Sequence, residues 1–164
     1  MNTLCIRPAE ERDIATICSW LKIYAEKKIV LPRDEADIRF YLKNFIVAER
    51  DGVLAGCVAF RSFGNDLYEV RSLVVNPEIQ RSGVGRAMME WKLQQFRSEN
   101  RPIRLFSLTL VPEFFYRLGF TLAQKEDFPE KIWSDCSKCP KLHCCDEIAV
   151  LLPINAGKES DGSL

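Results

Sequence analysis

The sequence predicts an α+β fold, in which a mixed and mostly antiparallel central sheet is flanked by helices on both faces. Asp51-Gly52 lies between two apolar runs, which is the strongest short-range signal for a β-hairpin. The stretch 68–97 joins a β-branched apolar run to a glycine-bearing turn and then to helical spacing of apolar residues. Further apolar runs and short helical patterns alternate as far as residue 152, so strands and helices are mixed along the chain.

The N-terminal half is predicted to begin with a short strand over residues 3–7, followed by two helices. Pro8 suits a helix entry because its φ is already fixed and it has no N–H to satisfy. The first helix is indicated by apolar residues that recur on one face: Ile14, Ile17, Cys18, Leu21 and Tyr24. Asp34 is the expected cap of a second, shorter helix. Three successive antiparallel strands are then predicted, over residues 45–49, 53–63 and 67–75.

The C-terminal half is predicted to continue with a helix of about four turns that begins near Val84 and ends before Arg101-Pro102. A short helix over residues 112–118 should end at Gly119. The remaining strands are predicted over residues 103–110, 120–123 and 147–152. The pattern indicates one domain over residues 1–154 and a flexible polar tail over residues 155–164.

Composition is that of a globular protein, with 164 residues, 47% hydrophobic and 28% charged. The formal net charge of zero argues against nucleic acid or an anionic membrane as a partner. No apolar run approaches the roughly 20 residues of a membrane helix, and the N-terminus lacks the pattern of a secretory signal. We therefore expect a cytoplasmic protein in which Cys5, Cys18 and Cys57 are small core residues.

Four further cysteines are clustered near the C-terminus. Cys136, Cys139, Cys144 and Cys145 could hold zinc together, or His143 could supply the fourth ligand. Packing as thiols, or forming a disulfide under oxidation, are the alternatives. The spacing is tighter than in most zinc modules and the sequence has no second CxxC, so we expect no metal site.

The turn between the strand 67–75 and the next helix is suited to binding a phosphate. Its glycines let the backbone approach a ligand, and the free N–H groups at the helix start favour an anion. The motif Gln80-x-x-Gly83-x-Gly85 resembles the acetyl-coenzyme A signature of the GNAT acetyltransferase superfamily. Residues 115–120, Phe-Tyr-Arg-Leu-Gly-Phe, follow in the expected order and are similar to a second motif of that superfamily. The resemblance covers nearly all of residues 3–152.

This resemblance implies a GNAT fold and acetyl-CoA as cosubstrate. A bulge in the strand 67–75 would splay it from the strand 103–110 and admit the pantetheine arm. A backbone N–H near Val74 or Val75 would polarise the thioester carbonyl. The residues implied in coenzyme binding are Leu73, Val74, Val75, Gln80, Arg81, Ser82, Gly83, Val84, Gly85 and Arg86.

The resemblance also implies catalytic roles. Tyr116 matches the tyrosine that protonates the departing coenzyme A thiolate, although its ring could simply pack in the core. Glu69 is the candidate general base, with a solvated strand carboxylate as the alternative. Arg71 shares a strand face with Glu69, so it could bind a substrate carboxylate or pair with Glu69.

A narrower resemblance concerns the substrate. Residues 29–49 and 127–152 are similar to short, single-domain amino-acid N-acetyltransferases that make N-acetylglutamate. Arg33 matches the arginine that grips the substrate's α-carboxylate in that group, and its planar fork suits the contact. A solvated surface arginine is the alternative.

We therefore expect an enzyme that transfers acetyl to the α-amino group of an amino acid, foremost L-glutamate, the first step of arginine biosynthesis. The amine would attack directly within a ternary complex. Another amine, such as a protein N-terminus, a lysine or a small metabolite, and a non-catalytic acyl-CoA-binding module are the alternatives. The superfamily commonly dimerises, which leaves a homodimer open.

Overall fold

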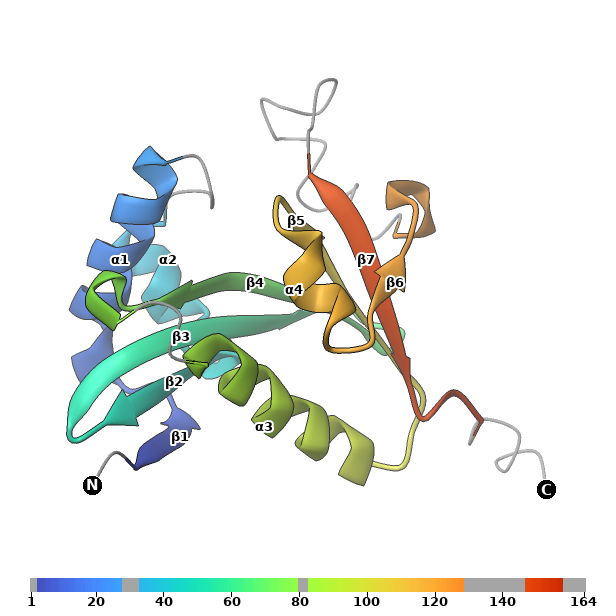
Figure 1. The fold of residues 1–164 in the computed structure, drawn as a ribbon, viewed down its shortest axis with the longest axis horizontal. Coiled ribbons are helices and arrows are strands. Elements are labelled where there is room, and N and C mark those ends of the chain that lie inside the picture. Colours follow the sequence, from blue (N-terminus) through green and yellow to red (C-terminus); the bar gives the residue numbers. More distant parts are fainter. Residues whose placement is uncertain (1–2, 28–32, 80–82, 129–146, 158–164) are drawn as a thin grey trace. The chain divides into compact units, whose positions relative to one another are not determined.

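The computed structural model describes residues 3–27, 33–79, 83–128 and 147–157. The strands and helices follow one another along the chain in the predicted order (Figure 1). In chain order they are β1 (Leu4–Pro8), α1 (Ile14–Glu26), α2 (Glu35–Phe40), β2 (Phe45–Arg50), β3 (Val53–Ser62), β4 (Leu67–Val75), α3 (Val84–Ser98), β5 (Ile103–Thr109), α4 (Pro112–Tyr116), β6 (Thr121–Leu122) and β7 (Ile148–Ile154). Within these ranges, none of the helices has the length and apolar character needed to cross a membrane.

The strands form one seven-stranded sheet in the order β1-β2-β3-β4-β5-β7-β6. β2 runs antiparallel to β1 and to β3, and β7 runs antiparallel to β5 and to β6. β4 and β5 are parallel and pair from Leu67–Arg104 to Glu69–Phe106. The predicted α+β architecture with a mixed, mostly antiparallel sheet is confirmed.

The hairpin between β2 and β3 turns through Asp51 and Gly52, whose φ angles are 53° and 79°. Positive φ at both central residues is the geometry that the Asp-Gly pair favours. The predicted hairpin is therefore confirmed together with its turn chemistry.

The chain divides into two compact units, residues 1–60 with 70–95 and residues 61–69 with 96–164. β3 and β4 each continue from one unit into the other. The single domain over residues 1–154 stays a prediction.

In the first unit, helices cover both faces of β3. Cys57 and Ala59 lie in a core cluster with Ile17 and Leu21 of α1. Side chains alternate along a strand, so Gly56 faces the other way, toward Val84 and Met88 of α3. Helices on both faces of the sheet are therefore confirmed within this unit.

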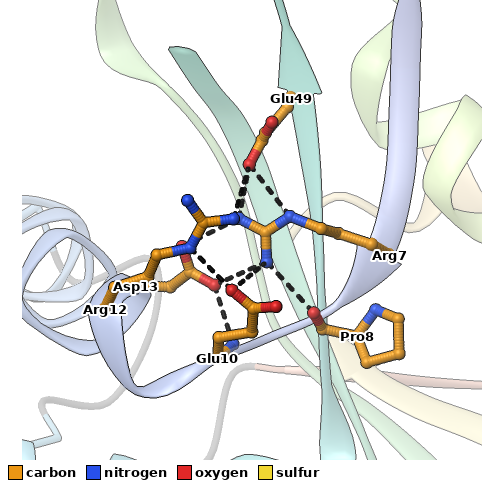
Figure 2. A network of polar contacts seen from close by, with 6 residues as sticks. All are labelled: Arg7, Pro8, Glu10, Arg12, Asp13 and Glu49. Atoms are coloured by element: carbon orange, nitrogen blue, oxygen red, sulfur yellow. Dashed lines mark hydrogen bonds and ion pairs between the residues drawn. The ribbon is translucent and has the colours of Figure 1, made fainter. Parts of the chain in front are cut away.

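A network of charged groups ties the start of α1 to the sheet in the same unit (Figure 2). Two nitrogens of the Arg7 guanidinium donate to the two carboxylate oxygens of Asp13, at 2.8 and 3.0 Å. Arg7 Nε donates to Glu49 on β2 at 2.9 Å. Asp13 is buried, and burial alone would raise the pKa of its carboxyl. The hydrogen bonds from Arg7 and from the Glu10 backbone outweigh that effect, and this pKa lies below its usual value.

The second unit is built on β5, β7 and the helix that follows β5. Phe106 of β5 stacks on Phe128 at a centroid distance of 4.2 Å, and both lie in a cluster with Leu67 and Ala149. α4 ends at Tyr116, and Gly119 then adopts a φ of 98°, which a side chain would disfavour. The predicted stop at Gly119 is confirmed, although the helix is shorter than residues 112–118.

One expectation about the cysteines is wrong. Cys57 is buried and Cys18 is half-buried, but Cys5 is exposed. Cys5 lies on β1, the strand at one edge of the sheet, where alternate side chains face solvent. An apolar neighbourhood in the sequence therefore did not indicate burial at this edge.

Candidate functional site

The second half of β4 departs from a regular strand. Glu69 and Val70 are consecutive and both buried, but so are residues 45–48 of β2 and 55–60 of β3. Ser72 follows with a φ of 55°, a left-handed conformation that is uncommon for a residue other than glycine. A left-handed residue within a strand is typical of a β-bulge, so the conformation of Ser72 supports the bulge predicted for this strand.

Asn76 terminates β4 and opens the turn toward α3. Its backbone N–H donates to the Ala55 oxygen at 2.8 Å, and its side-chain amide donates to the Leu54 oxygen at 3.1 Å. Its side-chain oxygen accepts from the Glu78 N–H at 3.0 Å, which holds the turn. The sequence indicated a break at Asn76-Pro77, but the two bonds to β3 depend on tertiary contact.

α3 begins directly after Gly83, whose φ is 78°. The Ala87 N–H donates to the Gly83 oxygen at 3.0 Å, which is the first bond of the helix. The N–H groups of Val84, Gly85 and Arg86 precede it, so the helix itself supplies no acceptor for them. These donors, with the positive end of the helix dipole, are suited to an anion such as a phosphate.

The Arg86 side chain, which the sequence suggested as a positive charge for the coenzyme, forms an ion pair within α3. Its Nε donates to Glu90 one turn further along α3 at 2.7 Å, and both side chains are exposed. Gln80, Arg81 and Ser82, the other half of the predicted motif, lie outside the described residues.

Gly56 is a residue of this region that sequence reasoning missed. A Cβ built on it would lie 2.9 Å from Met88 Cε and 3.0 Å from the Val74 oxygen and Val84 Cγ1. Only glycine therefore lets β3, the end of β4 and the start of α3 approach this closely. A glycine inside a strand pattern was the available signal.

Glu69 and Tyr116 both belong to the second unit. Glu69 is 4% exposed on β4, so a solvated strand carboxylate does not describe it. Tyr116 ends α4 and is 41% exposed, so its ring is not packed in the core, whereas the preceding Phe115 is buried. Their roles as base and acid stay predictions.

Arg33 and Arg71 belong to the first unit, and both are half-buried. The Arg33 carbonyl accepts a hydrogen bond from the Cys18 thiol of α1, with sulfur and oxygen 3.5 Å apart. Arg71 precedes Ser72 at the bulge of β4. Contact of either arginine with a substrate stays a prediction.

The four clustered cysteines and His143 lie outside the described residues. Elsewhere, in the parts of the chain that the structure describes, no group of His, Cys, Asp and Glu is arranged to hold a metal ion.

Comparisons with known proteins agree with the strand, turn and helix described above. A family model for the acetyltransferase (GNAT) domain matches residues 41–122. An uncharacterized N-acetyltransferase of Chlorobaculum tepidum is 39% identical over 147 residues, which are 90% of this chain and 94% of that protein. An amino-acid acetyltransferase of Neisseria meningitidis is 32% identical over 76% of this chain, but over only 29% of its own length.

Among solved structures, this chain is similar to N-acetylglutamate synthase from Neisseria gonorrhoeae complexed with coenzyme A and N-acetyl-glutamate. The TM-score is 0.82 at 26% identity, and the match covers 94% of this chain and 36% of that chain. This chain thus spans only part of the length of each Neisseria protein. The family match and the close relative agree, and the chain belongs to the GNAT family as an acetyl-CoA-dependent N-acetyltransferase.

Proposed function

We propose that this enzyme acetylates the α-amino group of an amino acid, and that L-glutamate is its acceptor. The similarity to N-acetylglutamate synthase bound to N-acetyl-glutamate, over 94% of this chain, is the observation that carries this proposal. In that case the reaction is the first step of arginine biosynthesis.

The coenzyme half of the site consists of the end of β4 and the start of α3. The N–H groups of Val84, Gly85 and Arg86 bind the pyrophosphate in this proposal, since they have no acceptor within the helix. Gln80, Arg81 and Ser82 complete the cradle, and Leu73–Val75 line the pantetheine arm. A backbone N–H of the β4 end polarises the thioester carbonyl and stabilises the oxyanion that forms on attack.

The chemistry follows from these assignments. Glu69 takes a proton from the substrate ammonium, directly or through water, because only the neutral amine can attack the acyl carbon. The new C–N bond forms, and the nitrogen, now positively charged, loses its second proton to water. The tetrahedral intermediate collapses, the C–S bond breaks, and water later reprotonates the Tyr116 phenolate left by the step that follows. Tyr116 gives its phenolic proton to the departing thiolate, which leaves coenzyme A as the thiol.

The acceptor is recognised by arginine. Arg33 binds the α-carboxylate through two parallel hydrogen bonds, a geometry that a planar guanidinium matches and an ammonium does not. Arg71 is a second candidate for a carboxylate of the acceptor.

The test is release of coenzyme A thiol from acetyl-CoA with a panel of amines. We expect turnover with L-glutamate and clearly weaker turnover with its decarboxylated analogue, an amine that lacks the α-carboxylate. Preference for a peptide N-terminus or a lysine side chain over every free amino acid would refute the amino-acid assignment. An N-acetylated product identified by mass spectrometry confirms that the amine is the acceptor.

A further inference from the structure

Tyr24 of α1 lies in the core and also makes a hydrogen bond that apolar packing does not require. The side chain is 5% exposed and packs in the cluster with Leu21 and Val74. Its hydroxyl donates to the backbone oxygen of Val75 at 2.8 Å. Val75 is the last residue of β4, on the strand whose end forms the coenzyme half of the site. A helix hydroxyl thus reaches the backbone of the coenzyme strand.

The peptide group between Val75 and Asn76 is held from both sides. The described residues contain no cis peptide bond, so the Val75 C=O and the Asn76 N–H of this group point in opposite directions. The N–H donates to Ala55 of β3 at 2.8 Å, while the C=O accepts from Tyr24. Two bonds on opposite ends of one rigid plane leave it little freedom to rotate.

These two hydrogen bonds also determine the direction of the Val75 N–H. In an extended strand the N–H and C=O of one residue face the same edge. The Val75 C=O faces away from β3, because the Asn76 N–H faces toward β3. The Val75 N–H therefore also faces away from β3, and β3 does not use it. Of the two candidate donors, Val74 and Val75, this geometry favours Val75 as the one presented to a ligand.

We propose that Tyr24 is a positioning residue for the acyl-coenzyme site: by holding the Val75 carbonyl, it aligns the Val75 N–H toward the thioester arm. The inference rests on the coenzyme half of the proposed function. It adds a side chain from α1, outside both motifs that identify the coenzyme site. A strand end without this anchor would sample other peptide orientations, so binding of the arm would first have to order it.

The test separates the hydroxyl from the ring. Tyr24→Phe removes the donor and keeps the buried aromatic surface. Ile17→Val, on the same helix and in the same cluster, is the matched control that loosens packing and removes no hydrogen-bonding group. Affinity for coenzyme A and for a non-hydrolysable acetyl-coenzyme A analogue that keeps the carbonyl is measured by calorimetry for wild type and both variants. The kinetic constants kcat and KM for each substrate and the thermal midpoint are measured alongside.

Loss of one neutral hydrogen bond predicts a roughly two- to tenfold weaker Kd for the acetyl-coenzyme A analogue and a similar loss of kcat/KM for acetyl-CoA in Tyr24→Phe. The KM for the amine should stay within about twofold of wild type. In valine-labelled protein, the Val75 amide resonance should move in Tyr24→Phe and shift less on addition of the acetyl-coenzyme A analogue. Ile17→Val should lower the thermal midpoint while leaving coenzyme affinity unchanged.

Equal affinity of Tyr24→Phe and wild type for the acetyl-coenzyme A analogue would overturn the inference, as would an equal loss in Ile17→Val. This outcome is distinct from failure of the proposed function. If wild type acetylates no amino acid, the acceptor assignment fails, but the titrations with the acetyl-coenzyme A analogue still decide the role of Tyr24.

Discussion

The backbone oxygen of Val74 lies 3.0 Å from the position that a Cβ on Gly56 would occupy, which is closer than side-chain carbons normally approach. The end of the coenzyme strand therefore packs against a neighbouring strand with no room for a methyl group. Because the obstructing atom is backbone, it cannot move aside as easily as the tip of Met88.

Gly56→Ala is expected to destabilise the fold by about 1–3 kcal/mol, the usual cost of overpacking a tight core. It should also weaken coenzyme A binding, since relief of the clash displaces either β4 or the start of α3. Urea unfolding and calorimetric titration measure the two effects. Gly157→Ala is the control, because a Cβ there meets nothing within 4 Å. Wild-type stability in Gly56→Ala would show that the packing is looser than described.

Arg7→Met is expected to destabilise the protein by about 3–5 kcal/mol at neutral pH, because it leaves the buried Asp13 carboxylate without its cation. The pKa of Asp13 is lowered in the folded wild type, so its contribution to stability is present above the unfolded-state pKa near 4. That contribution is lost as the pH falls through the lower, folded-state pKa.

The difference between wild type and Arg7→Met should therefore shrink on acidification below about pH 4, because the wild type loses the contribution of its charged Asp13 carboxylate as that group is protonated. Urea unfolding at a series of pH values checks this. Arg12→Met, an exposed neighbour in the same network, is the control and should cost little. A difference that is constant with pH would show that packing, rather than charge, holds this corner.

Tyr116→Phe is expected to lower kcat by about 10²–10⁴, the range for loss of a general acid, while coenzyme A affinity stays near wild type. The phenolic oxygen is the only group removed, and the residue is exposed at the end of α4, so the fold should tolerate the change. Steady-state rates and a coenzyme A titration supply the two readouts. Unchanged turnover would exclude this role for Tyr116.

Arg33→Lys keeps the positive charge but loses the two-pronged geometry of the guanidinium. If Arg33 binds the α-carboxylate, KM for the amino acid should rise by roughly tenfold or more, as expected for a lost hydrogen bond to a charged group. KM for acetyl-CoA should not change. Arg39→Lys, on the neighbouring helix and paired with Glu11, is the control. An unaltered KM for the amino acid in Arg33→Lys would show that Arg33 does not bind the α-carboxylate.

Protein purified without chelator is expected to contain no stoichiometric zinc, since the spacing of Cys136, Cys139 and Cys144 is tighter than in most zinc modules. Elemental analysis measures the metal content directly. One zinc per chain, lost on substitution of Cys139 by Ser, would contradict this expectation.

Local signals in the sequence predicted much of the fold. Asp51-Gly52 adopts the positive φ angles that its chemistry favours, and Gly119 ends the helix after β5 as expected. The order of strands and helices also follows the periodicity of apolar residues. Signals of this kind depend on neighbours within a few positions, which is why a single sequence suffices to detect them.

The anchors of the coenzyme strand could not be predicted in this way. The Tyr24 hydroxyl reaches Val75 across 51 positions, and Asn76 reaches Leu54 across 22. In the sequence, Tyr24 was one apolar member of a helix face, and only its position against β4 shows that the hydroxyl has a partner. Arg7 likewise meets Glu49 only because β1 pairs with β2.

The order of elements, the glycine turn before α3 and the family motifs can be predicted from the sequence, since each depends on residues close together in the chain. The fold is needed to show that Gly56 has no room for a side chain, that Glu69 is buried and that the Tyr24 hydroxyl bonds the Val75 oxygen. Burial and hydrogen-bond partners are set by segments distant in the sequence. No local pattern encodes which of them meet.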